Sequence, residues 1–144
     1  MEIDLLKSIP GGAELVDWFD ERVPSFHDAE ILTLTLDRQA ARCSFNIHTF
    51  QMTPETDETG HFVCIKHVVV VFKLEQVIDL ELTDFNHQNA IFGLDIVQIA
   101  DGGFRVELEP AYGLFGHIDA LSLTIELIPG VPADSIYAEQ DRAS

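Results

Sequence analysis

The sequence predicts a mainly β protein: an antiparallel β-sandwich, or a strongly curved sheet or barrel, of about seven strands with a short N-terminal helix. Segments with alternating or continuous apolar residues follow one another at short, even spacing. Turn-forming residues separate most of them, and strand and helix do not alternate repeatedly. Strands that are joined by short turns pair as antiparallel neighbours, whereas parallel strands need a long crossover connection.

The first expected elements are a helix and a strand. The Pro-Gly-Gly sequence at 10–12 precedes residues 13–22, in which Leu15, Trp18 and Phe19 lie at helical spacing. We expect a short amphipathic helix there, packed on the sheet. A strand follows from Phe26 to Asp37, because leucines at 32, 34 and 36 alternate with threonines.

The rest of the chain is expected to be strands and loops. The strands are predicted at residues 41–50, 62–72, 74–82, 91–99, 104–109 and 117–128. The acidic stretch 52–61 and the glycine-rich stretch 110–116 are predicted loops, and a short turn is expected within 73–76. Asp101-Gly102-Gly103 is the strongest hairpin signal. Residues 1–132 should form a single globular domain, and residues 133–144 a loose tail.

The charge of the chain is unusual. Asp and Glu total 25 against 8 Lys and Arg, which gives a net charge of −17. Such a surface repels phosphate backbones and anionic lipids, so we expect neither nucleic acid nor a membrane as partner. It attracts a basic protein, and it also simply keeps a protein soluble.

Other classes are made less probable by what the sequence lacks. It has no long apolar run and no basic-then-apolar start, and with two cysteines we expect a cytoplasmic protein. It has no phosphate-binding loop, no nucleophile elbow and no metalloprotease motif, so we expect neither an enzyme nor a cofactor. Cys43 and Cys64 alternate with phenylalanines and are expected in the core. The oligomeric state stays open.

One group of side chains suggests a metal site. His117 and Asp119 are in phase with the leucines of the last strand, as Asp28 and Glu30 are with those of the first. If those two strands pair, these groups and the adjacent His27 meet at one end of the core. Imidazole and carboxylate ligands suit zinc or manganese. The alternative is that these residues cap strand ends and bond to nearby backbone.

Several segments resemble the bacterial polymorphic-toxin immunity protein family numbered fifty. They are FHDAEILTLTLDR (26–38), HVVVVFKLEQVIDLELTDF (67–85), NAIFGLDI (89–96) and VELEPAYGLFGHIDALSLTIEL (106–127). The resemblance implies a small, mostly β cytoplasmic protein that binds and neutralises a cognate toxin.

Acidic segments are the expected contacts with a basic toxin, because many nuclease inhibitors mimic the phosphates of the substrate. The residues are Glu55, Asp57, Glu58, Asp79, Glu81, Glu107 and Glu109. Two alternatives remain: a small β-sandwich that binds a metal or a small ligand, and a structural or oligomerising domain. A flat acidic sheet face favours the immunity interpretation, and an inward-facing polar cleft favours the metal interpretation.

Overall fold

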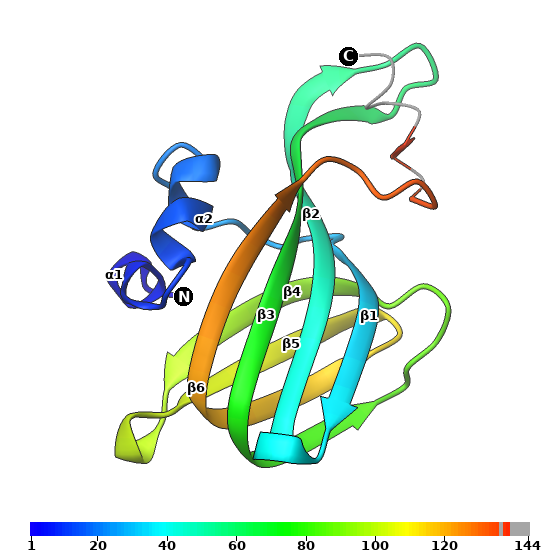
Figure 1. The fold of residues 1–144 in the computed structure, drawn as a ribbon. Coiled ribbons are helices and arrows are strands. Elements are labelled where there is room, and N and C mark those ends of the chain that lie inside the picture. The colour runs from blue at the N-terminus through cyan, green and yellow to red at the C-terminus, as the bar shows by residue number, and fades with distance from the viewer. Residues whose placement is uncertain (136, 139–144) are drawn as a thin grey trace.

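The sheet has six antiparallel strands, which close into a barrel in the order β1–β2–β3–β6–β5–β4 (Figure 1). A computed structural model describes residues 1–135, 137 and 138. The strands are β1 (Glu30–Asp37), β2 (Arg42–Thr56), β3 (Phe62–Thr83), β4 (Ala90–Gln98), β5 (Phe104–Tyr112) and β6 (Phe115–Pro129). The helices are α1 (Ile3–Ser8) and α2 (Gly12–Trp18). The mainly β class is therefore confirmed, in its barrel form.

Strand β3 explains why about seven strands were expected and six are found. The sequence predicts two strands, 62–72 and 74–82, with a turn within 73–76, but β3 runs through 22 residues without reversing. At Gln76 the backbone takes a left-handed conformation, with φ of 54°. Both Leu74 and Val77 contact the core, although strict alternation would put them on opposite faces. The polar residues within 73–76 therefore mark a corner inside one strand and not a turn between two strands.

The corner divides the barrel into two layers. β6 also bends where it runs beside β3. Ala120 and Leu123 show this, because both contact the core although they are three residues apart. The front layer contains β1, β2, the first part of β3 and the last part of β6. The back layer contains β5, β4 and the remaining parts of β3 and β6 (Figure 1). β1 and β4 close the barrel where Glu30 pairs with Ala90.

The core lies between the two layers. The rings of Phe45 and Phe72 are stacked with their centroids 4.8 Å apart, and Phe26 packs on Phe72 at 6.0 Å. Cys43 and Ile47 alternate with polar neighbours on β2 and are fully buried. The alternation read from β2 therefore sets which of its side chains enter the core.

The N-terminal helices cover the edge of β6 in the front layer (Figure 1). The amide of Ile125 donates a hydrogen bond to the carbonyl of Pro10 at 2.8 Å. The one predicted helix, 13–22, is wrong at its end: α2 stops at Trp18, because Asp20 and Glu21 adopt positive φ. The structure also adds α1, which the sequence reading did not predict.

Three predicted boundaries also differ. β1 begins at Glu30 and not at Phe26, because Phe26 and Asp28 have left-handed backbones that a strand does not contain. Half of the predicted loop 52–61 is strand, since β2 extends to Thr56 and pairs there with Phe62. The predicted loop 110–116 is likewise short, since β5 runs to Tyr112 and β6 starts at Phe115.

The sequence predicts that residues 133–144 form a loose tail. The described residues after β6 contact the front layer: the Gly130 amide donates a hydrogen bond to the carbonyl of His67, and the Ser135 hydroxyl donates one to the Glu30 carboxylate. Residues 136 and 139–144 lie outside the described residues. Among the described residues, no helix has the length and apolar character needed to cross a membrane.

Candidate functional site

The outer surface of the back layer carries an acidic face. We use this name for Asp79, Glu81, Asp95, Glu107, Glu109 and Asp119, together with Arg105 and His117. Strand register places Glu81, His117, Glu107 and Asp95 in one row across β3, β6, β5 and β4. Asp79, Asp119 and Arg105 form the neighbouring row. Adjacent strands are about 4.8 Å apart, so the carboxylates lie close together.

Some of this charge is compensated inside the face. The Arg105 guanidinium binds both oxygens of Asp119, with Nε to Oδ1 at 2.7 Å and Nη2 to Oδ2 at 2.9 Å. This bidentate pair holds the pKa of Asp119 below its usual value. The N-terminal ammonium lies 3.1 Å from Asp95. Within the described residues, Glu81 and Glu109 form no ion pair, so uncompensated charge remains.

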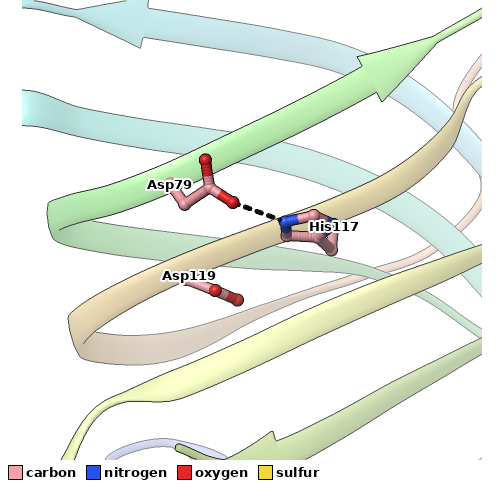
Figure 2. Close-up of side chains that lie close together, drawn as sticks. All are labelled: Asp79, His117 and Asp119. Carbon is pink, nitrogen blue, oxygen red and sulfur yellow. Dashed lines mark hydrogen bonds and ion pairs between the residues drawn. The ribbon is translucent and has the colours of Figure 1, made fainter. Parts of the chain in front are cut away.

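One part of the acidic face has the donor atoms of a metal site. Asp79, His117 and Asp119 each offer an atom within 4.8 Å of the others, and Figure 2 shows the Asp79 carboxylate bonded to the imidazole with Asp119 nearby on the same strand as His117. His117 Nε2 lies 2.9 Å from Asp79 Oδ2. Arg105, however, binds both Asp119 oxygens, so its guanidinium competes with a cation for this carboxylate.

The metal site expected from sequence required β1 and β6 to pair, and they do not. β1 pairs with β2 and β4, whereas β6 pairs with β3 and β5. His27 lies 3.5 Å from Asp28 and 3.3 Å from the carbonyl of Phe92, and the Glu30 carboxylate is bonded to other groups. The five residues are thus not brought together, and we assign no ligand role to His27, Asp28 or Glu30.

A second polar cluster lies on the front layer, beneath the segment that follows β6. Glu30 Oε1 accepts a hydrogen bond from Ser135 and lies 3.2 Å from His48 Nδ1. His48 Nε2 lies 3.0 Å from His67 Nδ1, and both histidines are buried. The Tyr137 ring covers them, with its centroid 5.8 Å from each imidazole. The hydrogen bond to His48, and then that from Ser135, hold the pKa of Glu30 below its ordinary value despite desolvation.

The two cysteines behave as core residues. Cys43 is fully buried, and desolvation raises the pKa of its thiol to about 11. Burial also raises the pKa of Cys64, with a smaller contribution from the charge of Asp28. A thiol with a raised pKa holds little reactive thiolate at neutral pH. The expectation of structural thiols agrees with these environments.

The expected partner residues fall into two separate groups. Asp79, Glu81, Glu107 and Glu109 belong to the acidic face, whereas Glu55, Asp57 and Glu58 lie at the β2–β3 turn, at the other end of β3. Asp57 has a local role, because its Oδ1 accepts bonds from Thr59 and His61. The Thr59 hydroxyl and these amides hold its pKa below the usual value.

Sequence reasoning missed the cluster of His48, His67 and Tyr137. One signal was present, since His67 opens a run of valines and a buried polar group needs a partner. The identity of that partner depends on how β2 and β3 are aligned, which the sequence does not reveal. No protein-family model, curated protein or solved structure matches the chain. The resemblance to immunity proteins therefore stays a prediction.

Proposed function

We propose that this chain is a non-enzymatic binding protein of the immunity type, and that its acidic face covers a basic surface of a cognate toxin. The observation that carries the proposal is the alignment of carboxylates in rows across four neighbouring strands. Charge complementarity on such a face steers a basic partner to it and fixes its orientation.

The acidic face places like charges close together, which destabilises the sheet, and a binding role accounts for this. Glu107 and Asp95 are direct cross-strand neighbours, and like charges in this position destabilise a sheet. The N-terminal ammonium compensates Asp95, but the described residues provide no such partner for Glu81 or Glu109. A basic partner supplies the missing compensation when it binds. The net charge of −17 also attracts a basic partner, and this attraction acts over a longer range.

The test is binding to the toxin domain whose gene adjoins that of this chain. One variant combines Asp79→Asn, Glu81→Gln, Glu107→Gln and Glu109→Gln. A matched control removes as many charges at exposed positions outside both groups of expected contacts, through Asp4→Asn, Glu14→Gln, Asp17→Asn and Asp37→Asn. At low salt we expect the face variant to bind at least about tenfold more weakly and the control to keep most of its affinity.

Calorimetry gives the affinities, and a toxin-activity assay gives neutralisation. Equal losses in the two variants would show that net charge alone matters and that the acidic face is not the contact surface. No binding of the wild-type chain at low salt would remove the support for an immunity function.

Metal binding is the second candidate function, and the proximity of Asp79, His117 and Asp119 favours it. Because Arg105 competes for Asp119, we expect Arg105→Gln to bind zinc more tightly than the wild type. Adding His117→Gln should abolish the gain. Calorimetric titration with zinc measures both, and the absence of binding in Arg105→Gln would exclude this site.

A further inference from the structure

One edge of β3 lacks a neighbouring strand beyond the corner at Gln76. Before the corner β3 lies between β2 and β6, and its pairing with β2 ends where Cys43 meets Leu74. After the corner, residues 77–83 pair with β6 alone within the described part of the chain. We call the other side of these residues the open edge. An unpaired edge presents backbone amides and carbonyls to which an incoming strand can bond.

The contact between β3 and Gly116 shows which backbone groups reach the open edge. A Cβ added to Gly116 on β6 would collide with the carbonyl oxygen of Glu81, so this carbonyl points at β6. Backbone groups alternate in direction along an antiparallel strand, so the amides and carbonyls of Leu80 and Leu82 point the opposite way. These groups are donors and acceptors that the open edge offers to another strand.

The side chains along the open edge alternate between acidic and apolar. Asp79 and Glu81 are exposed and belong to the acidic face, whereas Leu80 and Leu82 are half-buried and contact the core. Residues that lie opposite each other in neighbouring strands point to the same face of a sheet. An added strand therefore places one set of its side chains beside the two carboxylates and the other set beside the two leucines.

A cleft of about 330 Å³ adjoins the two leucines of the open edge. It lies between β3, which contributes Val77 and Leu80, and the segment from the end of β1 to the start of β2. Leu36 in that segment is 59% exposed, although Cys43, which lies opposite it on β2, is fully buried. The two layers are therefore open at this place, and an apolar side chain that enters the cleft covers Leu36 and Leu80.

Charge determines which kind of strand fits the open edge. Asp79 is bonded to His117, but Glu81 has no ion pair within the described residues. A second copy of the chain, paired on the same edge about a two-fold axis, would bring Asp79 opposite Glu81, and like charges in that position destabilise a pair of strands. Basic side chains in the same positions are attracted instead. Arg38 and Arg42 line the cleft from the segment opposite β3, so they favour apolar over basic side chains inside it.

Two other strand edges suit a basic strand less well. β1 and β4 pair with each other as strands only at Glu30 and Ala90, which leaves the rest of that side of each strand open. Residues 31–36 of β1 carry no charge, and on β4 the N-terminal ammonium already compensates Asp95. In the described part of the chain, unpaired backbone, uncompensated acid and an apolar cleft coincide at the open edge of β3.

We propose that the open edge of β3 takes up one more strand, in which basic and apolar residues alternate, and that the toxin supplies this strand. The basic side chains lie beside Asp79 and Glu81, and the apolar side chains lie beside Leu80 and Leu82 and enter the cleft. Backbone hydrogen bonds contribute affinity, and the alternating side-chain contacts contribute specificity. The inference rests on the proposed function, because the acidic face and the open edge share the same two acids.

Amide hydrogen exchange of the ¹⁵N-labelled chain, free and bound to the adjacent-gene toxin domain, tests the pairing. In the free chain the amides of Leu80 and Leu82 point to the open edge and should exchange quickly, whereas that of Glu81 is directed to β6. We expect the toxin to slow exchange at Leu80 and Leu82 at least about tenfold. If the toxin binds but these two amides still exchange quickly, strand addition is overturned while the immunity function stands.

Two synthetic octapeptides test the open edge without the toxin. One alternates lysine and valine, and the other alternates glutamate and valine. We expect the lysine peptide to slow exchange at Leu80 and Leu82, and the glutamate peptide to leave it unchanged. That result with a toxin that does not bind would remove the immunity function and keep the specificity of the edge for a basic strand. Slowing by neither peptide, or by both equally, would overturn the inference.

Leu80→Pro and Leu80→Ala form a matched pair of variants. Both remove the leucine side chain, but only proline also removes the amide that points to the open edge. We expect Leu80→Pro to bind the toxin at least about tenfold more weakly than Leu80→Ala. Equal affinities would overturn the inference, as would concentration-dependent protection of the Leu80 and Leu82 amides in the chain alone, since a second copy would then occupy the edge. If Leu80→Pro does not fold, amide exchange in the wild-type chain decides.

Discussion

Asp119 is the most constrained carboxylate on the acidic face, because Arg105 binds both of its oxygens and its side chain is only 10% exposed. Glu30 is constrained in a similar way by His48 and Ser135. For both carboxyl groups the folded protein lowers the pKa from the ordinary value. Through these two residues the stability of the folded protein therefore depends on pH in the acid range.

The sign of this effect is fixed. A carboxyl group with a lowered pKa adds stability above the pKa that it has when unfolded, and that stability is lost as pH falls through the folded value. We expect urea denaturation to show declining stability from about pH 4 downward, with a smaller decline in Asp119→Asn. Glu14→Gln, at an exposed helical position, serves as the control. An identical decline in Asp119→Asn and the wild type would contradict this account.

Gly11, which precedes α2, lies directly against the backbone of β6. Gly11 has φ of 88°, and a Cβ at this position would lie 1.7 Å from the carbonyl oxygen of Ile125. The neighbouring hydrogen bond from Ile125 to Pro10 holds the N-terminal helices against the strand edge. A side chain at position 11 therefore has to push the helices away from the barrel.

A pair of glycine substitutions separates this collision from backbone strain. Gly60 has a similar φ of 86°, but nothing lies within 4 Å of its added Cβ. We expect Gly60→Ala to cost about 1 kcal/mol from strain alone, and Gly11→Ala to cost about 2 kcal/mol or more beyond that. Urea denaturation measures both. Equal costs would show that the helices do not dock as described.

At the scale of the whole molecule, alternation predicted the strands well where one face meets the core. Residues 104–109 were found as a strand because their apolar residues keep period two, and Leu123, Ile125 and Leu127 do the same in the last part of β6. The same reasoning was wrong at Gln76, where β3 has a corner and not a turn. A bend inside a strand and a turn between strands both appear in sequence as a polar interruption, and only the pairing partner distinguishes them.

The candidate sites were predictable only in part, for the same reason. Acids at 79, 81, 107 and 109 were recognised as surface charge, and register then joined them into one face. The expected convergence of Glu30 with His117 failed, because strand order is a long-range property. The pairing of His48 with His67 was missed because it depends on that same register.

The acidic face as the toxin-binding surface is the central claim, and mapping the contact by NMR tests it most directly. The ¹⁵N-labelled chain is titrated at low salt with its adjacent-gene toxin domain, and amide shifts are followed residue by residue. We predict that the largest changes fall on β3 after Gln76, on β5 and on the first part of β6. Changes centred on the β2–β3 turn or on the front layer, with the acidic face unperturbed, would contradict the account.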